Sequence, residues 1–174
     1  ATSVIASNSS TPPVAGIVSQ ANSDTLTSLA SYLKSQYNYD PGSFQGYSFK
    51  TNSYKINARV DWNINSKSVL SLKYNYLKSY ADQFASTSRP GSGQVTGGQP
   101  GTYSMPYYGA GYRINNDLNI YLAELNTRIS NKASNKFQIG YTRERDFRSA
   151  QSASSDFPHV DILNAGNIYT DFGF

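Results

Sequence analysis

The sequence has 174 residues, a formal charge of +4, no cysteine and 15 tyrosines, and only 38% of its residues are hydrophobic. Leu, Ile and Val are too scarce for a thick dry core, while the aromatic content and a regular polar–apolar alternation exclude a disordered chain. The absence of cysteine excludes a disulfide scaffold and a thiolate metal site, and no apolar run reaches the length of a transmembrane helix.

The first 48 residues predict a loop that contains one short helix. Residues 1 to 22 are rich in Ser, Ala, Thr and Asn, which is typical of irregular structure. Residues 24 to 37 predict the helix, because apolar side chains recur at helical spacing and Ser23 or Asp24 can cap its first turn. The turn-forming run at 40 to 42 ends it. Its apolar face comprises Leu26, Leu29, Ala30, Leu33 and Tyr37.

Two alternating segments then predict a β-hairpin. In residues 54 to 64, YKINARVDWNI, every even position is apolar or aromatic and every odd position is polar or charged. This period of two is that of a β-strand with two different faces. A polar turn at 65 to 67 leads to a second strand from residue 68, which alternates in the same way.

A second hairpin follows a long polar insert. Residues 79 to 115 are dense in Gly, Ser, Pro and Tyr, and a loop of this length is unusual within a compact domain. Alternation returns at 117 to 130 and, after a short turn, from 136 to about 148. Residues 149 to 174 predict another loop, so short and long connections alternate along the chain.

Two architectures fit these strands. One is a soluble antiparallel sheet with one face on a core. Only the helix at 24 to 37 could cover such a face, and it is too small for four strands. The other is a transmembrane β-barrel, whose apolar face meets lipid and whose polar face lines a wet lumen. Eleven residues span about 36 Å and, tilted by roughly 45°, cover about 25 Å of membrane. We favour the barrel.

The barrel interpretation gives each segment a place. Residues 1–48 and 149–174 become extracellular loops, the second leading to a next strand, and 49–148 become two wall hairpins joined by the extracellular loop 79–115. The fold class is then all-β, an antiparallel transmembrane barrel segment of about four strands with short periplasmic turns. The predicted lipid-facing residues are Ile56, Val60, Trp62, Leu72, Tyr74, Leu125, Ile139 and Tyr141; the predicted lumen-facing residues are Lys55, Arg59, Asp61, Lys73, Glu124 and Arg128.

Several phrases carry a family resemblance. KINARVDWNINSKSVLSLKYNYL at 55 to 77, LNIYLAELNTRISNKASNKFQIGYTRERD at 118 to 146 and FPHVDILNAGNIYTDFG at 157 to 173 are the main ones, with YLKSQYNYDPGSFQGYSF at 32 to 49. They resemble TonB-dependent outer-membrane receptors, above all the Oar-like and SusC-like branch. The likeness extends over most of residues 32 to 174, and its motifs belong to the barrel wall.

The resemblance implies nutrient uptake across a bacterial outer membrane. Such receptors are barrels of about 22 strands that hold an N-terminal plug, which TonB displaces to admit a solute such as an oligosaccharide or peptide. SusC-like members also pair with a surface lipoprotein. Here neither a plug nor a TonB box is present and only about four strands are predicted, so we expect this chain to be a segment of a longer protein.

Catalytic motifs are scarce. The single histidine, His159, lies in a predicted loop, where a structural or solvent-exposed role is the simpler expectation. Asp61, Glu124, Glu144 and Asp146 are candidates for the paired acids of a glycosidase, but basic residues on the same faces favour cross-strand ion pairs. We therefore expect no enzyme activity, no cofactor and no metal site. The basic residues form no run, so we also expect no nucleic-acid partner.

The tyrosines of the long insert are the best candidates for ligand contact. A tyrosine ring offers a flat apolar surface and a hydroxyl, which suits sugars, peptides or a protein partner. Packing against neighbouring loops is an equally good explanation of them. The alternative to a receptor barrel is a soluble β-rich module at the cell surface that binds carbohydrate or protein. The candidate ligand-binding residues are Tyr103, Tyr107, Tyr108 and Tyr112.

Overall fold

The computed structural model describes residues 4–85, 99–152 and 157–174. The described part of the chain is mainly β-structure, with 56% of its residues in strands against 12% in helices, and its larger sheet is antiparallel. The all-β class is therefore confirmed. The chain divides into two compact units, each described below by itself: unit 1 comprises Ala1–Lys50, Ala81–Ile114 and Arg148–Phe174, and unit 2 comprises Thr51–Tyr80 and Asn115–Phe147.

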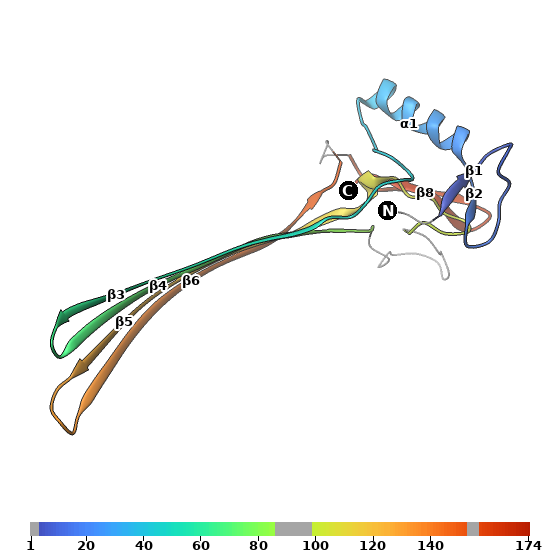
Figure 1. The fold of residues 1–174 in the computed structure, drawn as a ribbon. Coiled ribbons are helices and arrows are strands. Elements are labelled where there is room, and N and C mark those ends of the chain that lie inside the picture. Colours follow the sequence, from blue (N-terminus) through green and yellow to red (C-terminus); the bar gives the residue numbers. More distant parts are fainter. Residues whose placement is uncertain (1–3, 86–98, 153–156) are drawn as a thin grey trace. The chain divides into compact units, whose positions relative to one another are not determined.

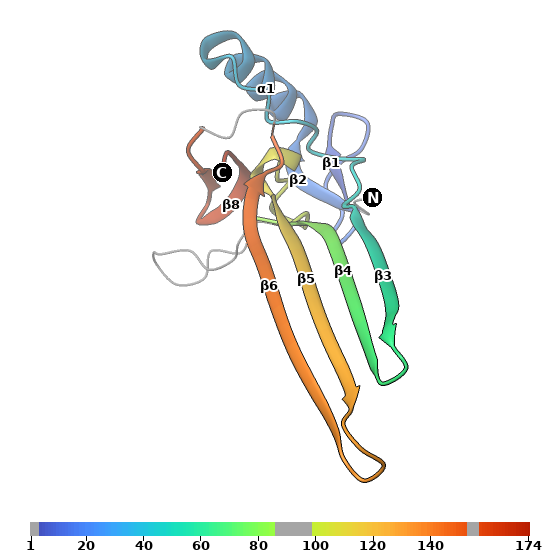
Figure 2. The ribbon, with the colours of Figure 1, turned by 90° about the vertical axis from the view of Figure 1, so that its left-hand side faces the viewer.

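Unit 2 is built from the greater part of four long strands that lie side by side in the order β3-β4-β5-β6 (Figures 1 and 2). Residues 81–83 of β4, 112–114 of β5 and 148–150 of β6 belong to unit 1. In the described residues β3 and β6 each have a neighbouring strand on one side only. The strands alternate in sequence, as a two-faced sheet requires. They are β3 (Thr51–Asn65), β4 (Ser68–Gln83), β5 (Tyr112–Arg128) and β6 (Ser134–Ala150).

Both predicted hairpins are confirmed. The first turn is tightened by the side chain of Asn65, whose Oδ1 accepts a hydrogen bond of 2.8 Å from the amide of Lys67. In the second, the amides of Ile129 and Ser130 both donate to the carbonyl of Ala133, each at 3.0 Å. Asparagine and serine favour turns because their side chains form hydrogen bonds with nearby backbone groups. The strands extend beyond the predicted ends, to Gln83 and Ala150.

Unit 1 contains four short strands that the sequence did not predict. β1 (Ile5–Ser7) pairs in parallel with β2 (Val18–Asn22), and β7 (Val160–Asn164) pairs antiparallel with β8 (Asn167–Phe172). The predictions of plain loops at 1–22 and 149–174 are therefore wrong for these strands. Each strand has three to six residues, which is too short for a clear alternation.

The predicted helix is confirmed as α1 (Ser23–Tyr37). Its cap is Asn22 rather than Ser23 or Asp24: the Asn22 side chain accepts from the amides of Asp24 and Thr25. It ends at Asn38, which adopts the left-handed conformation at φ 52° that asparagine tolerates well, before the predicted turn at 40 to 42. Within the described residues, no helix combines the length and the apolar character needed to cross a membrane.

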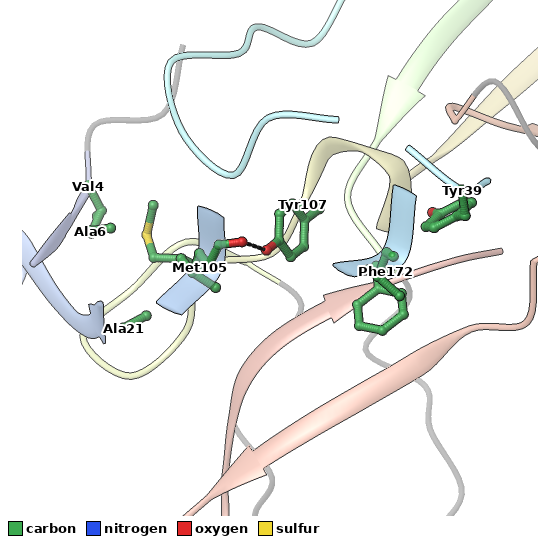
Figure 3. Close-up of a cluster of buried hydrophobic side chains, with 9 residues drawn as sticks. Val4, Ala6, Ala21, Tyr39, Met105, Tyr107 and Phe172 are labelled. Atoms are coloured by element: carbon green, nitrogen blue, oxygen red, sulfur yellow. Dashed lines mark hydrogen bonds between the residues drawn. The ribbon is translucent and has the colours of Figure 1, made fainter. Parts of the chain in front are cut away.

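The core of unit 1 joins segments that are far apart in the sequence. Tyr39, Met105, Tyr107 and Phe172 are all buried in one cluster (Figure 3). Residues 105 to 107 run beside β8, because the Met105 amide donates to the Tyr169 carbonyl and the Tyr107 amide to the Asp171 carbonyl, each at 3.0 Å. Part of the predicted loop 79–115 thus forms the centre of a packed unit, while its residues 86–98 lie outside the described ranges. The helix contributes Leu26 and Leu33, and β1 and β2 contribute Ala6 and Ala21.

Candidate functional site

One face of the unit 2 sheet carries a row of stacked tyrosines. Tyr74 on β4 stacks on Tyr121 of β5 with ring centroids 4.9 Å apart, and Tyr121 stacks on Tyr141 of β6 at 6.3 Å. Tyr76 extends the row along β4 at 6.5 Å from Tyr74. Cross-strand aromatic pairs of this kind stabilise a sheet, and tyrosine suits a boundary between an apolar layer and water.

Large apolar side chains accompany this row and are open to solvent. Val60, Trp62 and Ile139 are 63%, 62% and 61% exposed. Soluble proteins rarely expose a contiguous apolar surface of this kind, and where they do it normally marks an interaction site. A shallow hollow of about 670 Å³ crosses all four strands here. Its apolar and aromatic lining includes Ala58, Val60, Leu72, Tyr74, Tyr121, Ala123, Ile139 and Tyr141. Together these residues define the apolar face.

The opposite face is polar and is connected by ion pairs. Glu124 on β5 lies 3.8 Å from Lys73 of β4 and 3.0 Å from Lys136 of β6, so one carboxylate bridges three strands. Asp61 on β3 pairs with Arg59 at 2.9 Å and also accepts a hydrogen bond from the hydroxyl of Ser71 on β4. These contacts define the polar face.

The contacts place most of the residues that were predicted to face lipid or the lumen on one of these two faces. Leu72, Tyr74, Ile139 and Tyr141 line the hollow with Val60, while Asp61, Lys73 and Glu124 join the polar network with Arg59. Ile56 and Trp62 share the even positions of β3 with Val60 and are 55% and 62% exposed. Leu125 is half-buried on β5. Whether these faces meet lipid and lumen stays a prediction, as does the facing of Lys55 and Arg128.

The predicted ligand-binding tyrosines do not form one cluster. Tyr107 is 1% exposed and its hydroxyl donates to the carbonyl of Leu26 in the core of unit 1, so the prediction that it contacts a ligand is wrong: its ring is part of the packing. Tyr108 donates to the carboxylate of Asp82 at 3.2 Å. The Arg148 guanidinium lies 4.8 Å from the Tyr112 ring. Tyr103 is 45% exposed and remains a candidate.

A buried carboxylate organises the surroundings of Tyr108, and sequence reasoning missed it. The side chain of Asp82 is fully buried, and it accepts from Arg113 Nε at 2.7 Å, from the Lys50 amide at 3.1 Å and from Tyr108. Burial raises the pKa of Asp82, but the donors around it outweigh burial and hold that pKa below its ordinary value. A polar residue at the end of a strand gave no sequence signal for burial.

Tyr108 also lines a cavity in unit 1. The cavity has a volume of about 360 Å³, and Tyr47, Lys50 and Tyr108 contribute its larger side chains. The hydroxyl of Tyr47 donates to the carbonyl of Pro106 at 3.3 Å, and its ring lies 5.5 Å from that of Tyr108. An aromatic pair beside a lysine could contact a small polar solute. The remaining lining residues are Gly42, Ser43 and Ser48.

Comparison with known proteins gives no assignment. No protein-family model, curated protein or solved structure matches the chain. Its function must therefore be argued from the two faces of the sheet.

Proposed function

We propose that this chain forms part of the wall of an outer-membrane β-barrel, in a receptor that takes up nutrients and resembles the TonB-dependent receptors. One observation carries the proposal. A single four-stranded sheet exposes large apolar side chains such as Trp62 and Ile139 on one face, while ion pairs around Glu124 connect its other face. Lipid is the solvent that favours such an apolar surface, and a wet lumen favours the polar one.

The dimensions of the strands support the same proposal. The four strands contain 15, 16, 17 and 17 residues, whereas about 9 to 11 tilted residues are enough to cross a bilayer. We assign the additional residues to the end of each strand that leads into the long connections. On β6 it carries Arg143, Glu144, Arg145 and Asp146 in succession, so both faces of the strand are polar there. This end therefore belongs outside the hydrocarbon layer.

The open edges require further strands. Backbone N–H and C=O groups at a sheet edge have no partner in lipid, and each unsatisfied group costs several kcal/mol. Because β3 and β6 pair on one side only in the described residues, a membrane-embedded form needs additional strands to close the barrel. In the proposed receptor these strands come from the rest of the barrel.

The proposed partners follow from the same family. They are outer-membrane lipid, the remaining barrel with its plug, TonB, and a surface lipoprotein cap, with no nucleic acid and no enzyme activity. The solute is of the oligosaccharide or peptide class. In unit 1, exposed Tyr103 and the cavity beside Tyr47 and Tyr108 offer aromatic surfaces to such a solute.

The experiment that tests this proposal is gel mobility of the native protein from an outer-membrane fraction, with and without boiling. An antibody against residues 79 to 115 identifies the band. We expect a heat-modifiable band several times larger than 19 kDa, because closed barrels resist unfolding by detergent until they are heated. A band near 19 kDa in the soluble fraction, unmoved by heat, would overturn the proposal in favour of a soluble surface module that binds carbohydrate or protein.

A further inference from the structure

The β7–β8 hairpin places two carboxylates opposite each other. The strand register pairs Asp161 directly with Asp171, and like charges at such a position destabilise an antiparallel pair. Asp171 is fully buried, whereas the Asp161 side chain is 30% exposed. A cation bound between two opposed carboxylates relieves their mutual repulsion.

The single histidine of the chain lies beside this pair. His159 is two residues before Asp161, so both side chains leave the strand on the same face. Its Nδ1 lies 3.2 Å from the carbonyl oxygen of Gly173, and its Nε2 lies 3.2 Å from Oδ1 of Asp161. Because a carbonyl can only accept, Nδ1 carries the proton in that contact. In a neutral ring, Nε2 then directs a lone pair toward the carboxylate.

The distances suit coordination of one metal ion. One ligand atom from each of His159, Asp161 and Asp171 lies within 4.8 Å of the others. Two donors at about 2.1 Å from a zinc ion stand about 3.4 Å apart at the tetrahedral angle, close to the 3.2 Å between Nε2 and Oδ1. Small rotations of the carboxylates about χ2, which is a soft torsion in aspartate, bring the remaining oxygens to this separation.

We propose that His159, Asp161 and Asp171 form a binding site for a divalent transition-metal ion, with Zn²⁺ as the best match to one imidazole and two carboxylates. The ion would neutralise the opposed carboxylates and accept the lone pair of Nε2. The Gly173 carbonyl would fix the ring, as outer hydrogen bonds commonly do for metal-binding histidines. The site lies within unit 1 and stands independently of the proposed barrel, and it departs from the expectation of no metal site that the sequence alone suggested.

Three protein ligands leave coordination positions open. The side chains of His159 and Asp161 are 32% and 30% exposed, so an ion can enter from solvent, and a water molecule or an oxygen of a bound molecule can complete its shell. Binding would also stabilise the β7–β8 hairpin, because the metal-free form keeps two opposed carboxylates.

The test uses the purified full chain, with Zn²⁺ alone as the probe. We expect calorimetry to show one saturable site, and Zn²⁺ to raise the melting temperature by several degrees through mass action. The variants H159Q and D161N should each bind Zn²⁺ at least tenfold more weakly. Co²⁺ should give a visible absorption spectrum in the unaltered chain and none in H159Q. Since the chain has one histidine and no cysteine, such a spectrum reports this site.

The variant D161N separates the metal site from a simple ion pair. If the metal site exists, Zn²⁺ raises the melting temperature of the unaltered chain but not that of D161N. If His159 and Asp161 form only an ion pair, Zn²⁺ raises the melting temperature of neither chain. The proposal is overturned by that second result, by the absence of saturable Zn²⁺ binding to the unaltered chain, or by unchanged binding to H159Q.

Discussion

At the scale of the residue, Asp82 is a buried acceptor with several donors around it. It accepts from Arg113, Lys50 and Tyr108 while its side chain is fully buried. We expect D82A to lower the free energy of unfolding by about 3 kcal/mol, because it leaves buried donors without their acceptor. Urea unfolding followed by circular dichroism measures this change.

The matched control for Asp82 is an exposed aspartate of the same unit. Asp40 lies 3.6 Å from Lys34, and both side chains are more than half exposed. The Gly42 amide donates to Asp40 Oδ1 at 2.9 Å, and the amide oxygen of an asparagine can still accept this bond. D40N should therefore change the free energy of unfolding by less than about 1 kcal/mol. Equal effects of D82A and D40N would contradict the assigned role of Asp82.

Two tyrosines make unit 1 sensitive to alkaline pH. Burial raises the pKa of both Tyr47 and Tyr107 well above the ordinary value near 10. The unfolded chain therefore releases these two protons at lower pH than the folded chain does. The contribution of the two tyrosines to the free energy of unfolding is fully present below about pH 10 and decreases as the pH rises further. Urea unfolding at about pH 8 and 11 should show this loss. Y47F should reduce it, whereas the same change at exposed Tyr103 should not.

At the scale of the element, β6 allows a test with adjacent residues. Ile139 lies on the apolar face and is 61% exposed, and Gln138 points to the opposite face at the same depth. I139R should destabilise the barrel by about 2–4 kcal/mol at mid-membrane and diminish the heat-modifiable band. Q138R should be tolerated, because it adds a cation to the face that carries Glu124. Equal tolerance of both changes would show that neither face meets lipid.

The sequence predicted the elements whose signals are local. The alternation of Tyr54–Ile64 and the polar turn after it were sufficient for the first hairpin, and apolar spacing was sufficient for α1. Strands β1, β2, β7 and β8 were missed because their stability comes from partners far along the chain. For example, the Gly173 amide donates to the Tyr39 hydroxyl at 2.9 Å, a contact that no local pattern indicates.

The two faces of the candidate site were predictable from the sequence, but its buried residues were not. The two faces of the long strands follow from the period of two, and the contacts of Glu124 and Tyr121 agree with it. Tyr107 was assigned to a ligand because a Gly- and Pro-rich segment suggested an open loop, whereas backbone hydrogen bonds to β8 draw it into the core. The burial of Asp82 also depends on distant segments. Composition does not reveal such long-range packing.

For the whole molecule, the central claim is that one face of the sheet meets lipid and the other meets water. The chain has no cysteine, so single cysteines can be placed on β6 at positions 136, 137, 138, 139 and 141 and labelled with a fluorophore. The labelled protein is examined in its native outer membrane or in reconstituted vesicles that contain lipids with quenching acyl chains.

Quenching at these positions is the most direct test of the account. We predict strong quenching at Phe137, Ile139 and Tyr141, and weak quenching with ready access to a water-soluble quencher at Lys136 and Gln138. Acyl-chain quenching that is absent at every position, or that fails to alternate along the strand, would contradict a sheet with one face in lipid and the other in water.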